Sequence, residues 1–228
     1  MFSVIFEVFP RKERFNDYLE LAKHLKPILE GIDGFVDNER FESTRRPGWL
    51  LSHSTWRDEK SVIRWRTVGE HHAVQEKGRF EIFGDYHLRV GDVLADTSPP
   101  KEAPIHEQRF DETEIGAAKF ATLTEVVLEG KDSTISAQQL GFEASASAVV
   151  DYDLFKSIYT PGKLALLVSW RDRAAALAWT PRKAAGIRSL RQRTIRIVRD
   201  YGIFDRREAP QFYPDVSGSQ DTRSSGKA

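Results

Sequence analysis

The chain has 228 residues, enough for one large domain or two small ones, and its composition of 40% hydrophobic and 30% charged residues excludes an intrinsically disordered protein. Its 34 basic residues balance 34 acidic residues, so no excess positive charge attracts nucleic acid or anionic membranes. The absence of cysteine excludes disulfides, thiolate metal sites and cysteine nucleophiles. No apolar stretch approaches the ~20 residues of a membrane span, and the positive charges near the N-terminus follow the apolar residues, which favours a cytoplasmic protein.

The first 94 residues predict a unit of four strands and two helices. Apolar side chains alternate from Phe2 up to Pro10, which ends the first strand, and helical spacing follows. Pro27 is expected to end or kink the first helix, Asp58 to cap the second, and Gly84 to form a bulge in the last strand. In chain order, the expected elements are a strand over 2–9, a helix over 15–30, strands over 35–44 and 49–56, a helix over 59–77 and a strand over 80–94.

The second half of the chain repeats the first at an offset of 114 residues. Between positions 36 and 65, 11 of 30 residues are identical to their counterparts, where chance gives roughly two. Trp56 falls on Trp170 and Trp65 on Trp179, so a pair of tryptophans nine residues apart recurs in register. The alternative explanation, convergent strand–turn–strand composition, is disfavoured by this recurring pair.

Two copies of one unit therefore make up the chain. The second copy keeps its strands, over 120–128, 149–159, 163–170 and 191–204, but its first helix is reduced to about Ser133–Gln139 and Pro181 breaks its second. The predicted organisation is a unit over 1–94, a linker over 95–118, a degenerate second unit over 119–216 and a disordered tail over 217–228.

The element order β-α-β-β-α-β is that of a ferredoxin-like unit, whose antiparallel sheet carries helices on one face and leaves the other face bare. Two such sheets packed face to face bury both bare faces. The sequence therefore predicts an α+β protein of two tandem ferredoxin-like units whose sheets close on each other as an α/β barrel. Because the second sheet belongs to the same chain, we expect a monomer with an internal pseudo-dimer, or a homodimer through outer surfaces.

Several short motifs lie in the first unit. They are Glu39-Arg40-Phe41-Glu42-Ser43, Pro47-Gly48, Ser54-Thr55-Trp56-Arg57-Asp58-Glu59, Trp65-Arg66, His71-His72 with Gln75, Gly78-Arg79 and Asp85-Tyr86. Together they resemble the antibiotic biosynthesis monooxygenase family of dimeric α/β-barrel proteins. The resemblance implies the predicted barrel. It also implies a range of activities that includes cofactor-independent oxidation of quinol-like aromatic polyketides and haem degradation.

The imidazoles are confined to the first unit and the linker. In the second unit, Ala185 and Gly186 stand at the positions that match the adjacent histidines 71 and 72, and Leu167 stands at the position of His53. A polar active site is therefore expected in the first unit. Neutral drift of surface histidines is the alternative.

One helix face favours a pocket for a flat aromatic ligand. Trp65 and His72 are seven residues apart, about 700° of helix, and share one face if the helix is unbroken. On that face His72 could move a proton and Trp65 could stack on a ring, in a pocket between helices and sheet. His71 points about 100° away, unless Gly69 bends the helix. The alternatives are a core role for Trp65 and ordinary half-buried or solvated roles for both histidines.

The family resemblance adds Asn38, because an Asn at a comparable place binds a substrate oxygen in quinol-oxidising members, provided that the strand register matches. Arg66 is interpreted first as a solvated arginine, and contact with an anionic phenolate is the alternative that makes it a substrate-binding candidate. The catalytic candidates are His72, His71 and Asn38, and the substrate-binding candidates are Trp65, Arg66 and His53.

The haem-degrading branch requires, by resemblance, an Asn on the first strand, a Trp on the second helix and a His about ten residues after that Trp. The first strand has no Asn, and Gln75 stands ten residues after Trp65, so haem is the weaker expectation. Glu70-His71-His72 lacks the spacing of a zinc helix. Neither a metal nor another cofactor is expected.

Nine basic and two acidic residues lie between Arg182 and Arg207, which we interpret as a solvated strand edge, with an anion or nucleic-acid site as the alternative. The leading hypothesis is a cofactor-independent monooxygenase or oxidase of a small electron-rich aromatic, whose phenolate reduces O₂ directly. A non-catalytic ligand-binding or stress protein on the same fold is the second hypothesis, and a haem-binding protein the third. The expected partner is a small aromatic ligand, and neither nucleic acid nor a membrane.

Overall fold

The computed structural model describes residues 1–101, 103–131 and 133–210, so the predicted tail over 217–228 lies outside the described residues. No helix in these ranges is long and apolar enough to cross a membrane. The helices are α1 (Phe15–Glu30), α2 (Glu59–Arg66), α3 (Gly69–Lys77) and α4 (Arg173–Ala178), with short helical turns η1 (Lys12–Arg14), η2 (Gly78–Ile82) and η3 (Gln138–Leu140). The strands are β1 (Phe2–Pro10), β2 (Phe35–Ser43), β3 (Leu50–Trp56), β4 (Phe83–Asp96), β5 (Phe120–Leu128), β6 (Val149–Ser157), β7 (Lys163–Trp170) and β8 (Ile187–Gly202).

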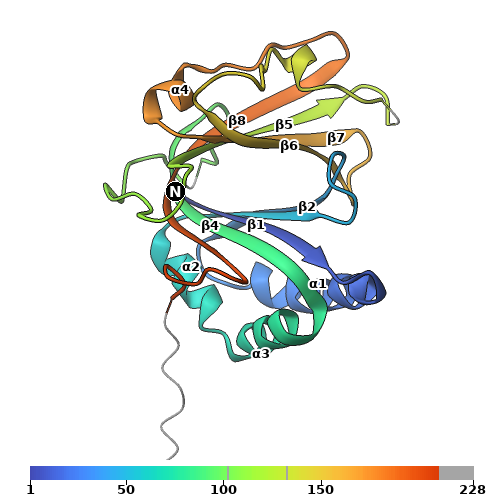
Figure 1. Ribbon diagram of the computed structural model, residues 1–228, viewed down its shortest axis with the longest axis vertical. Coiled ribbons are helices and arrows are strands. Elements are labelled where there is room, and N and C mark those ends of the chain that lie inside the picture. Colours follow the sequence, from blue (N-terminus) through green and yellow to red (C-terminus); the bar gives the residue numbers. More distant parts are fainter. Residues whose placement is uncertain (102, 132, 211–228) are drawn as a thin grey trace, which may run out of the picture.

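Each half of the chain forms a four-stranded antiparallel sheet, in the order β4-β1-β3-β2 in the first half and β6-β7-β5-β8 in the second. The two sheets face each other across a shared interior (Figure 1), which confirms the predicted α+β fold of two packed ferredoxin-like units. The edge strands also pair, β2 with β6 and β4 with β8, so the two sheets join into one closed barrel.

The two seams of the barrel differ in length. Three residue pairs join β2 to β6, whereas β4 and β8 pair from His87–Gly202 to Asp96–Arg193. Along β8, residues 187–196 pair with β5 and residues 193–202 pair with β4. The last part of β8 therefore lies along the first half of the molecule.

The barrel interior is a packed core that both halves share. Apolar side chains from both sheets meet there, together with two residues of the connection between the halves, Ala103 and Ile105. The buried members are Met1, Ile5, Phe41, Leu51, Val93, Ala103, Ala121, Leu123, Phe155, Ala165, Leu167, Ile195 and Ile197. The stretch predicted as a linker thus packs against the barrel, after β4 has continued to Asp96.

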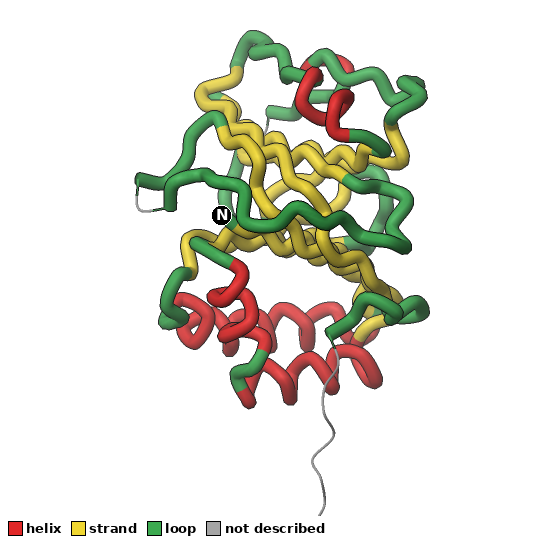
Figure 2. The backbone as a smooth tube through the Cα atoms, turned by 90° about the vertical axis from the view of Figure 1, so that its left-hand side faces the viewer, coloured by secondary structure: helices red, strands yellow, loops and turns green. Residues whose placement is uncertain are grey.

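The outer faces of the two sheets are covered differently. Helices α1, α2 and α3 lie over the first sheet, whereas loops and the short α4 cover the second (Figure 2). The predicted helix over Ser133–Gln139 is wrong, because only the turn η3 forms there. In its place Leu140 and Phe142 bury their side chains on the outer face of the second sheet.

Two helix predictions in the first half need correction. Pro27 neither ends α1 nor stops the helix before Glu30, since Leu25 and Leu29 on either side are buried and this packing outweighs the lost hydrogen bond. The helix predicted over 59–77 is two helices, because Thr67 ends α2 and Val68 is extended, with φ −65° and ψ 127°.

The Asp58 cap is confirmed, with the Ser61 amide donating to it at 2.8 Å. The Gly84 bulge is also confirmed, because the register of β1 on β4 shifts there.

Candidate functional site

The break between α2 and α3 brings Trp65 and His71 together. Their rings stack with centroids 3.9 Å apart and planes 15° from parallel. His71 Nδ1 lies 3.0 Å from the backbone carbonyl oxygen of Trp65. An unbroken helix would have placed His72 on the face of Trp65. Because Val68 is extended, His71 and not His72 lies against Trp65.

The protonation state of His71 follows from these contacts. A carbonyl oxygen only accepts hydrogen bonds, so Nδ1 carries the proton and Nε2 keeps its lone pair. Burial lowers the pKa of His71 to about 4, although the hydrogen bond to Trp65 acts in the opposite direction. The ring is therefore neutral at physiological pH and presents Nε2 as a hydrogen-bond acceptor.

The other candidates of the first half lie around this stack. His72 is 37% exposed at its side chain, with Nε2 3.9 Å from a carboxylate oxygen of Glu76. Arg66 follows Trp65 at the end of α2 and is half-buried. Trp65 packs on the outer face of the first sheet, against a cluster of Phe2, Leu29, Trp56, Val90 and Val198.

Asn38 shares the face of the sheet that Trp65 covers. It stands opposite Ser54, whose hydroxyl accepts a hydrogen bond from the Trp56 indole at 2.9 Å. The Asn38 side-chain amide donates to the carbonyl of His53 at 2.8 Å, and its oxygen accepts from Arg40 at 3.1 Å. These bonds hold the Asn38 side chain against the surface of the sheet. Its role in binding an oxygen atom of the substrate stays a prediction.

His53 lies on the opposite face of the sheet, inside the barrel, and is 2% exposed. Its Nε2 is 2.7 Å from the hydroxyl of Ser3. Burial, and then the charge of Arg193, lower the pKa of His53 to about 4. The sheet separates His53 from the other five candidates, so the structure does not bring all six together.

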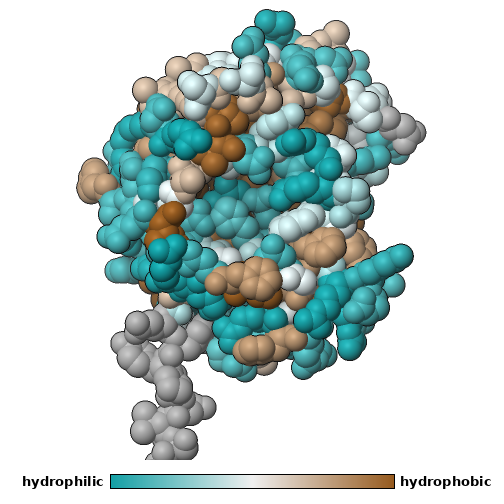
Figure 3. Space-filling model, in the orientation of Figure 1, coloured by the Kyte–Doolittle hydropathy of each residue, from teal (hydrophilic) through white to brown (hydrophobic). Residues whose placement is uncertain are grey.

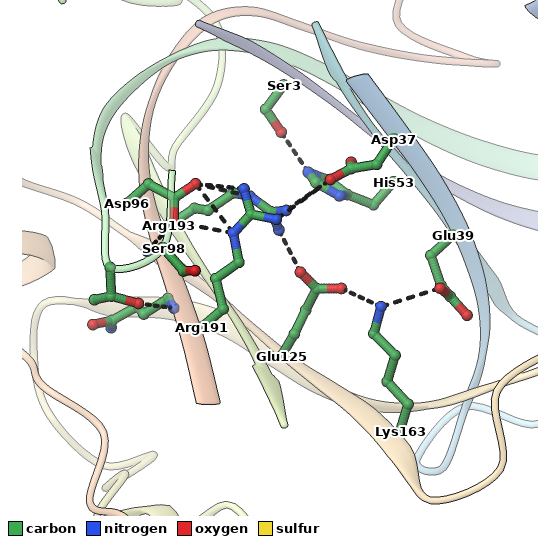
Figure 4. A network of polar contacts seen from close by, with 12 residues as sticks. Ser3, Asp37, Glu39, His53, Asp96, Ser98, Glu125, Lys163, Arg191 and Arg193 are labelled. Carbon is green, nitrogen blue, oxygen red and sulfur yellow. Dashed lines mark hydrogen bonds and ion pairs between the residues drawn. The ribbon is translucent and has the colours of Figure 1, made fainter. Parts of the chain in front are cut away.

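Charged side chains surround His53 at this end of the interior (Figure 4). Lys163 of the second half contacts Glu39 of the first at 3.1 Å and Glu125 at 2.9 Å. Burial alone would raise the pKa of Glu125, but the charges of Arg193 and Lys163 outweigh it and hold this pKa at about 2. The opposite charges in this network neutralise each other. The network also joins the two halves, because Lys163 pairs with Glu39 and Arg193 with Asp37. On one face, hydrophilic residues also form a band between the halves (Figure 3).

The interpretation of the arginine-rich stretch as a solvated strand edge is wrong. β8 pairs on both sides, and Arg193 is 1% exposed. Its guanidinium lies 3.2 Å from Asp37 across the interior, while Arg191 lies 2.7 Å from Asp96. The signal that could have revealed this is the acidic residues on facing strands, which only the barrel topology places opposite the arginines.

A second buried network lies nearer the other end of the interior. Glu7 pairs with Arg46 and with the fully buried Arg89, and these charges lower its pKa although its burial acts to raise it. Arg46 also pairs with Asp153 of the second half at 2.7 Å. The described residues contain no group of three His, Asp or Glu side chains that could hold a metal ion.

Pockets in the described residues include two of similar volume. One, of about 330 Å³, lies at the start of β2 and is lined by Gly34, Phe35, Val36, Arg57, Pro100 and Ala103. The other, of about 320 Å³, lies in the second half beside Glu129 and Gln139. Neither is lined by Trp65 or His72, and the His71 ring occupies one face of Trp65 where a flat ligand was expected to stack.

Comparison with known proteins identifies the family. The family of antibiotic biosynthesis monooxygenases matches residues 1–77. The jasmonate monooxygenase ABM of Pyricularia oryzae is 40% identical over 223 residues, which cover 95% of this chain and all of that protein. The chain belongs to the antibiotic biosynthesis monooxygenase family. This membership supports a monooxygenase-like function.

One solved structure with a TM-score above 0.5 shows a similar fold. An aldoxime dehydratase in complex with butyraldoxime is 12% identical with a TM-score of 0.54, over 86% of this chain and 79% of that one. A crystal structure of an antibiotic biosynthesis monooxygenase is 16% identical with a TM-score of 0.37, over 44% of this chain and 100% of that one.

Proposed function

We propose that this chain is a monooxygenase that uses O₂ without a bound cofactor and oxidises a small ring compound beside the Trp65–His71 stack. The observation that carries the proposal is the neutral His71, whose Nδ1 donates to the Trp65 carbonyl and whose Nε2 lone pair is left for a substrate. Such an acceptor orients a substrate hydroxyl or an acidic C–H and receives its proton.

The chemistry requires no external reductant. Once the proton has moved to His71, the electron-rich anion transfers one electron to O₂, and the radical and superoxide combine to a peroxide. Oxidation of an activated CH₂ to C=O then releases water, so the substrate supplies all four electrons that O₂ accepts. The protein contributes orientation, the proton acceptor and exclusion of solvent.

Two substrate classes are proposed for this site. Quinol-type aromatics follow from the family resemblance and from the flat indole of Trp65. A ring-containing carboxylic acid follows from the 40% identical relative, whose name gives jasmonate as its substrate. Non-catalytic binding of either class is the competing function on the same fold.

Oxygen uptake by the purified chain tests the proposal. Anthrone, a naphthoquinol and jasmonic acid are supplied in turn, without added metal, flavin or haem, and the products are identified by mass spectrometry. We expect uptake with at least one of them, and a product that gains one oxygen atom from ¹⁸O₂. Uptake only after haem is added, or binding without uptake for all three compounds, would contradict the proposal.

A further inference from the structure

The pocket of about 330 Å³ at the start of β2 is separate from the Trp65–His71 stack, because the described residues that line it include neither ring. Its volume falls at the lower end of the range for small-molecule sites, about 300–1,000 Å³. The turn before β2, the first residues of β2, the residue after β3 and the connection between the halves supply its lining: Gly34, Phe35, Val36, Arg57, Pro100 and Ala103.

An irregularity in β2 forms one wall of this pocket. The pairing of β2 with β3 skips Val36 between Phe35 and Asp37. A bulge of this kind bends a strand and redirects its side chains. Phe35 packs with the outer cluster of the first sheet, whereas Val36 packs with the core of the barrel interior. The two side chains therefore line one pocket from different layers of the molecule.

Gly34 brings the backbone of the turn close to α2 and to Arg57. Its φ is +88°, in the region that favours glycine. A Cβ atom on it would overlap the Ser61 side chain of α2 and would lie 3.3 Å from the guanidinium carbon of Arg57. The missing side chain therefore leaves room for the Arg57 guanidinium at the edge of the pocket.

The charge of Arg57 is balanced by its neighbours. Its terminal nitrogens donate to both carboxylate oxygens of Asp33 at 2.8 Å, and its Nε donates to Asp58 at 3.2 Å. Arg64 lies 3.0 Å from Asp33 as well, so two arginines face two aspartates here. A charged ligand would have to displace one of these pairs and lose its own hydration. The balance favours an uncharged ligand.

Arg57 still has donors for such a ligand. A guanidinium has five N–H groups, and the bonds to Asp33 and Asp58 use three of them. The remaining two belong to the terminal nitrogens. All other side chains of the lining are apolar: Phe35, Val36, Pro100 and Ala103. An apolar wall with donors from one residue matches a molecule that has an apolar body and one carbonyl oxygen.

We propose that this pocket is a further small-molecule site, which binds a small uncharged ester or ketone. Arg57 donates to the carbonyl oxygen, and the apolar part of the ligand lies against Phe35 and Val36. Because Pro100 and Ala103 belong to the connection between the halves, the bound molecule contacts the connection as well as the first sheet. The site does not depend on the proposed oxidation, since neither Trp65 nor His71 takes part in it.

Three molecules of similar shape and different charge test the class of ligand. Methyl phenylacetate, phenylacetate and phenethylammonium are titrated into the full chain, and ¹H–¹⁵N spectra report the dissociation constants and the amides that shift. We expect the ester to bind with a dissociation constant on the order of 1 mM, the affinity typical of so small a ligand. The amides of Gly34, Phe35 and Ala103 should shift. Both ions should bind about 10-fold more weakly or not at all.

Matched variants locate the site. Val36→Phe fills the pocket and should abolish ester binding, whereas Val150→Phe, at the matching bulge of the second half, should not change it. Arg57→Met should weaken ester binding about 10-fold or more, the value for a lost hydrogen bond from a charged donor. Arg64→Met removes the other arginine on Asp33 and should leave ester binding unchanged. If melting temperatures show that Val36→Phe fails to fold, the two arginine variants still decide.

Tighter binding of either ion than of the ester overturns the uncharged class of ligand. Absence of ester binding at about 10 mM, or shifts that leave out Gly34, Phe35 and Ala103, overturns the site. Equal weakening by Arg57→Met and Arg64→Met overturns the role of Arg57 as the donor. All these measurements report binding and not turnover, so a failure of the proposed oxidation would leave them unaffected.

Discussion

The same tryptophan has different neighbours in the two halves of the molecule. Trp65 stacks on the His71 imidazole. Trp179, at the matching position, packs with ring centroids 5.9 Å from Phe142 and 6.0 Å from Trp170. The loop that replaces a helix in the second half brings in Phe142, which is 2% exposed. The sheets of the two copies have thus kept their pattern, while the matching tryptophan meets an imidazole in one half and aromatic rings in the other.

Substitution of His71 should reveal the largest difference. We expect His71→Ala to lower turnover by about 10²–10⁴-fold, the range for loss of a group that transfers a proton. His72→Ala should have a smaller effect, because its ring does not stack on Trp65. His106→Ala, in the connection between the halves, is the control. Wild-type turnover in the His71 variant, measured by oxygen uptake, would show that the imidazole has no catalytic role.

Phe142→Ala should lower stability and leave turnover unchanged, which is the opposite of the result expected for His71→Ala. The Phe142 ring fills the place beside Trp179, so we expect a loss of about 3–5 kcal/mol in the free energy of unfolding, as for other buried aromatic truncations. Turnover per folded molecule should not change. Urea denaturation measures the first quantity and active-site titration the second. A large loss of activity with little loss of stability would place the reaction in the second half.

Acid should destabilise the protein over two adjoining pH ranges. The pKa of His53 is lowered from 6.5 to about 4, so its contribution to stability is complete above pH 6.5 and is lost as the pH falls from 6.5 towards 4. The pKa of Glu125 is lowered from 4.5 to about 2, so its contribution is lost between these values. Each shift corresponds to roughly 3 kcal/mol.

His53→Leu, which installs the residue that the second half carries at this position, isolates the first range. This variant should show a shallower loss of stability between pH 6.5 and pH 4. The measurement is urea denaturation at several pH values. An unaltered slope above pH 4 would mean that His53 is not held neutral in the folded barrel.

Removal of the matched helix caps should have the smallest effect on stability. Asp58 and Asp172 each accept a backbone hydrogen bond at 2.8 Å, and each substitution by Ala should cost about 1 kcal/mol. Asp58→Ala should cost more, because Asp58 also accepts from the Ser61 hydroxyl at 2.7 Å and from Arg57 at 3.2 Å. Thermal unfolding ranks the two, and a larger effect of Asp172→Ala would be the contrary result.

Much of the fold could be predicted because it depends on local pattern and on the repeat. Strands over 120–128 and 163–170 and the Asp58 cap follow from alternation and capping chemistry. The break at Val68 could be predicted only in part: Gly69 allows a bend, but neither Thr67 nor Val68 is a strong helix breaker. That one turn decides which histidine meets Trp65.

The interior charges could not be predicted for a different reason. Asp37 and Arg193 are 156 residues apart in the sequence and meet only because two edge strands pair. An alternating strand with arginine on one face has the pattern of a half-exposed strand until its facing partner is known. The contribution of Arg206 to the first half depends on the same seam, which carries the chain back beside Tyr86.

The β4–β8 seam also determines the order in which the protein can be completed. β4 ends at Asp96 and β8 begins at Ile187, so the chain must be extended by most of the second half before the longer seam can form. At ribosomal speed this takes on the order of 10 s. During that time the newly made first half has two unpaired strand edges, β2 and β4, which are sites for unwanted pairing between nascent chains. Helices α1–α3, which lie over the first sheet, are synthesised before this interval and leave those edges uncovered, so we expect the yield of folded protein to depend on chaperones that bind exposed strands.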